Sequence, residues 1–489
     1  MIQRNRTGTA AALVALALLA GGCTGATGGV RGTPGAAGLR DPYFPKLGNG
    51  GYDVGHYALS LAYDPRTGRL DGTAEITARA TQDLSAFNLD LAGLTVAAAT
   101  VDGAPAAHNR AGNELTLRPH DEIPEGAEFE ATVTYTGVPE PITDADGSEE
   151  GWLRTDGGAV AVGEPQGSMT WFPGNHHPSD KAAYDITLTV PAGLDAFSNG
   201  VRTERRTAAD GRVTTVWHAA EPMASYLATV AIGRFETGTA TAPLGADADA
   251  DSSASASASA RASVSADAGS VPVLTAAEPA VAASSAALRG EIPTILGRQA
   301  DRFGPYPFSA AGAIVMKDGP LGYALETQTR PVFPAASFDR ATLVHELAHQ
   351  WFGNSVTPAG WRDLWLNEGF ATYAEWLYAE EYENVPARTR FATAFAQDAN
   401  WAFPPADPPA AENLFDPPVY QRGAMVLHKL RETVGDRVFD EILRGWLAKY
   451  RHANATTDDF TAYAESVAGK DLDGLWDVWL YGDGKPEKP

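Results

Sequence analysis

Residues 345–354, HELAHQWFGN, place two histidines four positions apart around a glutamate. The leucine, valine and aromatic residues around them recur at helical spacing and a Gly-Asn pair closes the run, so the segment is predicted to be a helix. On a helix His345 and His349 stack on one face, and Glu346 lies about 100° around the axis from His345. Two imidazoles that converge on one point beside a carboxylate are the geometry of a metal-binding helix with its own acid/base group.

The alternative interpretation is a pair of hydrogen-bonded core histidines next to a solvated glutamate, and a third metal ligand would separate the two. Separated from His349 by eighteen residues, Glu368 stands in the first turn of a second predicted helix, DLWLNEGFATYAEWLYAEEY. Taken alone, an acid at that place would merely complement the helix dipole. The motif and its distance to Glu368 have to be considered together.

H-E-x-x-H followed by x18-E is the signature of the gluzincins, and HELAHQWFGNSVTPAGWRDLWLNEGFATYAEW closely resembles the M1 family of zinc aminopeptidases. The resemblance extends to FGPYPF, WFPGNHHPSDKAAY, VYQRGAMVLHKL and the closing WDVWLYGDGKP, and it covers roughly residues 46–485 apart from a low-complexity stretch. It implies a zinc aminopeptidase that removes N-terminal residues from peptides with a free N-terminus.

The resemblance makes His345, His349 and Glu368 the ligands of one Zn²⁺ ion per chain. Two imidazoles and one carboxylate leave a fourth position for water, as in catalytic zinc sites. Zinc lowers the pKa of that water, and Glu346 is expected to take its proton and pass it to the leaving amine. Tyr420 matches the family's oxyanion donor, although Tyr-Gln-Arg-Gly replaces the usual Tyr-Glu-Lys-Gly. A tyrosine packed at a helix start is the alternative.

The family also binds the free ammonium group of its substrate with carboxylates. YALET matches the family's G-x-M-E-N strand and assigns this role to Glu326, with Tyr323 and Thr327 in place of glycine and asparagine. A second anchor precedes the proline of the matching FPGNHHPSDK segment by nine residues, which assigns it to Glu164. Glutamates in solvent are the alternatives for both. The histidine pair at 176–177 is expected to lie exposed in a loop and not to form a second metal site.

The chain begins with features of an exported protein. MIQRNRTGTAAALVALALLAGGC has two arginines, an apolar run and then small residues, which predicts a signal peptide over residues 1–22. Cys23 is the only cysteine, which excludes a disulfide framework. LLAGGC resembles a bacterial lipobox, which implies cleavage before Cys23 and a lipid anchor at the outer face of the cell membrane. Simple secretion after cleavage elsewhere is the alternative.

Charge restricts the partners of this chain. A formal net charge of −24 disfavours binding to nucleic acid or to anionic lipid, so any membrane tie should come from the lipid at Cys23. We therefore expect no nucleic-acid partner.

Composition divides the chain into several regions. Gly, Thr and Pro dominate residues 23–45, which predicts a flexible tether. Alternating apolar residues, as in HYALSLAY and YDITLTVP, predict a saddle- or sandwich-like antiparallel β domain over residues 46–238. The Ala/Ser/Asp-rich stretch predicts a low-complexity insert without regular structure over residues 239–284. Helical periodicity then predicts a mainly helical α+β catalytic domain over residues 285–489, which the resemblance makes thermolysin-like.

Two other functions stay open. Tyr323 and Thr327 alter the surroundings of the amine anchor, so an endopeptidase with the same zinc chemistry is one alternative. The other is a lipid-anchored binding protein on a peptidase scaffold that has lost its activity, although retention of both histidines, both glutamates and Tyr420 argues against it. Larger family members continue into a helical domain that roofs the active site. Because this chain ends at Pro489, we expect its site to be more open.

Overall fold

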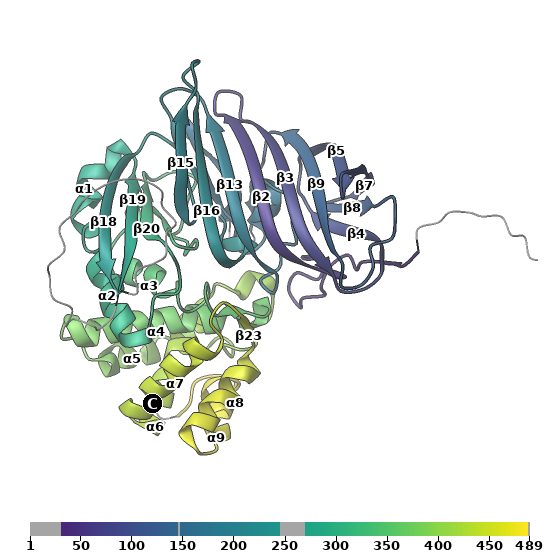
Figure 1. The fold of residues 1–489 in the computed structure, drawn as a ribbon. Helices are drawn as coiled ribbons and strands as arrows, with labels where there is room; N and C mark the ends of the chain where they lie inside the picture. Colours follow the sequence, from purple (N-terminus) through teal and green to yellow (C-terminus); the bar gives the residue numbers. More distant parts are fainter. Residues whose placement is uncertain (1–30, 145–146, 245–268, 488–489) are drawn as a thin grey trace, which may run out of the picture.

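The computed structural model describes residues 31–144, 147–244 and 269–487, so the predicted signal peptide and Cys23 lie outside the described residues. Figure 1 shows a β-rich N-terminal domain beside a mainly helical C-terminal domain, which confirms the predicted order. Among the described residues, no helix combines the length and the apolar character needed to cross a membrane.

The largest sheet of the β domain has eight strands. Its long strands alternate buried and exposed residues, and on β2 the side chains of Tyr57, Leu59 and Leu61 are buried as the HYALSLAY pattern predicts. The pairing is antiparallel except between β13 and β2, which run parallel. The spatial order is β15 (Val201–Thr207), β16 (Val213–Ala224), β13 (Lys181–Val190), β2 (Tyr52–Asp64), β3 (Arg69–Ala80), β9 (Glu128–Gly137), β5 (Thr95–Val101) and β6 (Ala104–Pro105).

Two smaller sheets complete the β domain. Apolar residues of the three sheets belong to one large buried cluster. One sheet has the order β1 (Thr33–Pro34), β4 (Leu84–Asp90), β8 (Glu114–Arg118) and β7 (Ala107–Ala111). The other has β10 (Ile142–Thr143), β11 (Glu149–Thr155), β12 (Gly158–Val162), β17 (Val230–Gly233) and β14 (Asp195–Ser198), with the short 3-10 helices η1 (Gly167–Thr170) and η2 (Ser225–Leu227) in its connections.

A four-stranded sheet opens the catalytic domain and corrects the prediction of a structureless insert over residues 239–284. β18 (Glu236–Pro243) pairs antiparallel with β19 (Ser270–Ala277), which runs parallel to β20 (Ala311–Met316) and leads into α1 (Pro279–Arg289). β18 has little apolar pattern of its own and is stabilised by pairing with β19, so composition could not reveal it. Residues 245–268 lie outside the described residues, and β21 (Val332–Pro334) completes the sheet.

Helices form the rest of the domain, and the helix predicted to continue to the Gly-Asn pair at 353–354 ends earlier, at Ala348. His345 lies on α3 (Arg340–Ala348), His349 caps the C-terminus of that helix, and Glu368 lies on α4 (Trp365–Tyr382). α6 (Gly423–Val434) packs against α4. A Cβ on Gly369 would lie 2.9 Å from the Cα of Gly423, so only glycine permits this approach. The other helices are α2 (Ile292–Phe303), α5 (Ala387–Ala396), α7 (Asp436–Lys449), α8 (Thr457–Ala468) and α9 (Asp473–Trp479).

Short elements connect these helices. A π-helical turn, η7 (Pro418–Arg422), precedes α6, and a parallel bridge joins β22 (Thr357–Pro358) to β23 (Asn454–Ala455). The 3-10 turns are η3 (Ala335–Ser337), η4 (Trp361–Asp363), η5 (Asp398–Trp401) and η6 (Ala411–Asn413). The YALET segment, which the resemblance makes a strand, forms only one isolated bridge, between Leu325 and Val332 of β21.

The predicted tether over residues 23–45 is also corrected where it is described, from residue 31 onward. Asp41 accepts a hydrogen bond from the backbone N–H of Trp361 at 3.0 Å. The hydroxyl of Tyr43 donates to the carbonyl of Pro408 at 2.8 Å. This segment therefore joins the edge of the β domain to the helical domain. Its Gly- and Pro-rich composition misleads because tertiary contacts and the short pairing of β1 with β4 hold it.

Candidate active site

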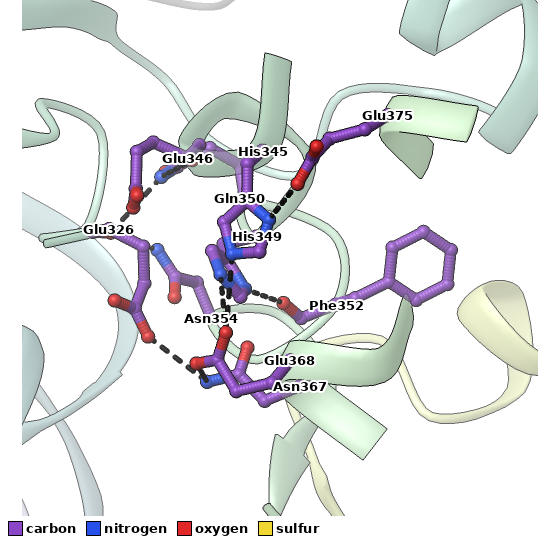
Figure 2. A network of polar contacts seen from close by, with 10 residues as sticks. All are labelled: Glu326, His345, Glu346, His349, Gln350, Phe352, Asn354, Asn367, Glu368 and Glu375. Atoms are coloured by element: carbon purple, nitrogen blue, oxygen red, sulfur yellow. Dashed lines mark hydrogen bonds and ion pairs between the residues drawn. The ribbon is translucent and has the colours of Figure 1, made fainter. Parts of the chain in front are cut away.

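The three predicted metal ligands come together between α3 and α4 (Figure 2). The rings of His345 and His349 lie on one side of α3 with centroids 4.5 Å apart. Their Nε2 atoms lie 3.2 and 3.5 Å from the same Oε2 atom of Glu368. One donor atom from each of the three residues lies within 4.8 Å of the others. The helix geometry inferred from the motif is therefore present.

Each histidine has a second partner that orients its ring. Nδ1 of His345 lies 2.7 Å from Oε1 of Glu375, and Nδ1 of His349 lies 3.1 Å from the carbonyl of Phe352. Because these oxygens accept a hydrogen bond from Nδ1–H, the lone pair of each neutral ring is on Nε2, which faces Glu368. Two imidazoles so oriented and a buried carboxylate fit a Zn²⁺ ion with an open coordination position.

Burial and mutual charge set the protonation of these ligands. Burial opposes a charge on His349, but the negative charges of Glu368 and Glu326 together outweigh it and raise the pKa of His349 to about 9. Against the effect of burial, the two histidines lower the pKa of Glu368 to about 2. A metal ion binds only neutral imidazole, so a cation at this place would displace protons that Glu368 stabilises.

Glu346 lies beside the ligands, and only 5% of it is exposed. Burial raises the pKa of its carboxyl to about 8, although the positive charges of His345 and His349 act in the opposite direction. A carboxyl group with such a pKa next to a metal site can take up a proton and return it near neutral pH.

A cavity of about 680 Å³ opens onto the metal ligands, and both predicted amine anchors line it. Glu164 follows β12 of the β domain, whereas Glu326 lies between β20 and β21 of the catalytic domain. Both are buried rather than solvated, at 7% and 2% exposure. Carboxylate oxygens of these two residues and of Glu368 lie within 4.8 Å of one another. The structure therefore unites residues that are far apart in sequence.

Glu326 is held by residues that the sequence did not single out. Its Oε1 accepts a hydrogen bond from Nδ2 of Asn367 at 3.0 Å. Its backbone carbonyl accepts from Gln350 at 3.2 Å and from Asn354 at 2.7 Å (Figure 2). Lys181 of the β domain in turn donates to the carbonyl of Asn354 at 3.0 Å. Adjacency to the metal ligands was the only sequence signal for Asn367 and Gln350.

Tyr420 lies on the π-helical turn η7 and lines the cavity. Its ring is nearly parallel to that of His345, with centroids 6.2 Å apart. Arg422, which departs from the family pattern, is completely buried and donates to the carbonyls of Phe403 and Trp479. These hydrogen bonds of Arg422 hold the C-terminal segment. Tyr420 lines the cavity even though Arg422 differs from the family pattern.

The expectation of an exposed histidine pair is wrong, because His176 and His177 are 2% and 6% exposed. The two ring nitrogens of His176 contact Ser225 Oγ and the carbonyl of Phe172, both at 3.0 Å. Nε2 of His177 lies 3.6 Å from Asp41. Within the described part of the chain, no candidate metal cluster includes either residue. Both histidines belong to the interior of the β domain.

Comparisons with known proteins agree with this site. Residues 54–227 match the Peptidase M1 N-terminal domain, and residues 337–479 match the Peptidase family M1 domain. An M1 zinc metallopeptidase structure from Deinococcus radiodurans is 30% identical, with a TM-score of 0.83 over 92% of this chain and 98% of that one. Aminopeptidase M1-A of Oryza sativa subsp. japonica is 30% identical over 352 residues, which are 67% of this chain and 37% of that protein. The chain thus spans little more than a third of this curated relative.

Proposed function

The chain belongs to peptidase family M1, and from this premise we propose that it is a zinc aminopeptidase that removes residues from the free N-terminus of peptides. The observation that carries the proposal is the approach of Glu164 and Glu326 to the metal ligand Glu368, with oxygens within 4.8 Å. Two buried carboxylates beside a metal site suit a substrate ammonium group. Only a substrate with an unblocked N-terminus offers that charge next to its first peptide bond.

Different residues of the site have different roles in the proposed hydrolysis. His345, His349 and Glu368 would hold the zinc ion, which supplies Lewis acidity to water and to the scissile carbonyl. Glu346 takes a proton from the attacking water and returns it to the leaving amine. The hydroxyl of Tyr420 donates a hydrogen bond to the oxygen that gains negative charge.

Matched peptides with free and acetylated N-termini test the aminopeptidase proposal. Acetylation removes the ammonium charge, so hydrolysis by the wild type should fall strongly. In Glu326→Gln, kcat/KM for free peptides should fall roughly 10- to 150-fold, since a hydrogen bond to a charged group contributes about 1.5–3 kcal/mol. Acetylation should then affect this variant much less.

The control for this experiment is the zinc content of Glu326→Gln, which should equal that of the wild type because no metal ligand is changed. Equal cleavage of free and acetylated peptides by the wild type would overturn the proposal and support an endopeptidase.

We also propose export and a lipid anchor at Cys23 on the outer face of the cell membrane. The support is the sequence alone, namely two arginines, an apolar run and the sole cysteine after LLAGG. Cys23→Ser should move the protein from the membrane fraction to the medium or block its processing. Unchanged fractionation together with unchanged mass would contradict the anchor and leave secretion by another cleavage as the explanation.

A further inference from the structure

The cavity wall is acidic beyond what the proposed hydrolysis requires. Eight of the described lining residues carry a carboxylate and none is a lysine or arginine. Five of the eight belong to the site described above, namely the metal ligand Glu368, its neighbours Glu346 and Glu375, and the two amine anchors. The remaining three are Asp144, Glu412 and Asp416, which come from two separate segments. Such a wall attracts cations and repels anions.

One corner of this cavity contains buried oxygens that lack a donor. Oε1 of Glu164 and the hydroxyl of Tyr323 have no hydrogen-bond partner among the described residues, and both side chains line the cavity. Glu150, which is completely buried, uses Oε2 to accept the backbone N–H groups of Gln166 and Gly167 at 2.8 and 2.7 Å. Its Oε1 also has no partner in the described structure. Unpaired buried oxygens are unfavourable, and a ligand that donates hydrogen bonds would offset this cost.

Negative charges act together at this corner. The pKa of Tyr323 is raised well above its usual value by burial and then by the charges of Glu150 and Glu164. Burial, with a contribution from Asp144, raises the pKa of Glu150 to about 8. A bound cation would stabilise the ionised form of Glu150, and the neutral hydroxyl of Tyr323 would remain beside it. An acidic side chain would meet repulsion, and an apolar one would leave the oxygens unpaired.

We propose that this corner accepts the side chain of the substrate's N-terminal residue and selects arginine and lysine. The proposal rests on the proposed aminopeptidase function, because it takes Glu164 and Glu326 as the site of the ammonium group. The N-terminal side chain leaves the same Cα as that ammonium group, and Glu164 belongs both to the amine site and to the corner. The side chain of Tyr323 lines the cavity at this corner, whereas Glu150, which has no exposed surface, acts through its charge.

Arginine and citrulline arylamides provide the first test, because citrulline has nearly the shape of arginine without its charge. We expect kcat/KM to be at least about 10-fold higher for arginine, and lysine to exceed norleucine similarly. Glutamate should be the poorest substrate. Calorimetric dissociation constants of free L-arginine and L-citrulline, measured on the zinc-loaded protein, should show the same preference without turnover. Arginine-to-citrulline ratios near one in both measurements would overturn the proposal.

Two variants test whether Glu150 and Tyr323 produce the preference for arginine over citrulline. Glu150→Gln keeps an oxygen for the two backbone N–H groups and replaces only the unpartnered oxygen with an amide, while Tyr323→Phe removes only the hydroxyl. Each should lower the arginine-to-citrulline ratio by about 10-fold. The control is Glu149→Gln, which removes the same charge from the opposite face of β11 and should leave the ratio unchanged. An unchanged ratio in both Glu150→Gln and Tyr323→Phe would refute the assignment to this corner.

The outcomes of these experiments distinguish the proposed side-chain pocket from the proposed aminopeptidase activity. Hydrolysis of neutral arylamides without a preference for arginine would refute the pocket and leave the aminopeptidase standing. Preferential binding of arginine without hydrolysis of any arylamide would support the pocket and refute the aminopeptidase.

Discussion

Glu375 offers a test of how the metal site is supported from outside its ligands. Its Oε1 lies 2.7 Å from Nδ1 of His345, and the side chain is 29% exposed. Removal of such a partner typically lowers metal affinity 10- to 100-fold, or about 1.4–2.8 kcal/mol. Because the side chain is partly exposed, water can replace the lost acceptor. We therefore expect Glu375→Ala to bind zinc about 10-fold more weakly, and Glu375→Gln, whose amide oxygen still accepts, to lose less.

Competition with chelators of graded affinity measures this effect. The matched control is Glu381→Ala, which removes an exposed carboxylate from the same helix about 9 Å further along and should keep wild-type zinc affinity. The reasoning fails if Glu375→Ala binds zinc as tightly as the wild type, or if the control is weakened equally.

Three further predictions concern catalysis, packing and pH. Tyr420→Phe should lower kcat on the order of 10²–10³-fold with zinc retained, and near wild-type turnover would remove Tyr420 from the mechanism. Gly369→Ala should lose about 1–3 kcal/mol of unfolding free energy, because its Cβ would lie 2.9 Å from the Cα of Gly423. Denaturation should show no such loss for Gly474→Ala, where a Cβ meets nothing within 4 Å. Burial lowers the pKa of His176 to about 4, so the folded state binds fewer protons than the unfolded state between that value and about 6.5. Wild-type stability should therefore fall by about 3 kcal/mol more than that of His176→Gln as pH drops through this window, and parallel urea-denaturation curves would disprove it.

The metal triad could be predicted because its geometry is mostly local. His345 and His349 share a helix face by their spacing alone, and the family motif supplied Glu368. Glu375 lies seven residues after Glu368 and so returns to the same face of α4 after two turns. The sequence could not show that this face meets His345, because that depends on the packing of α3 against α4.

The errors have a common physical cause. β18 is stabilised by the strand beside it, and the segment around Asp41 is held by contacts more than 300 residues away in sequence. Burial keeps His176 neutral, and its two ring nitrogens are satisfied by Ser225 and by the carbonyl of Phe172. In each case the prediction used only the composition of the segment itself. The structure of the segment depends on residues that are distant in the sequence.

The location of Glu164 in the β domain has a consequence for how such proteins can recombine. An exchange that replaced the β domain with an unrelated one would remove one of the two carboxylates proposed to hold the substrate amine. It would also remove Lys181, whose ammonium group binds the carbonyls of Asn354 and Ser355 at 3.0 and 2.9 Å, next to the support of Glu326. The metal ligands would survive such an exchange intact. The two domains should therefore be inherited, and grafted in protein engineering, as one unit.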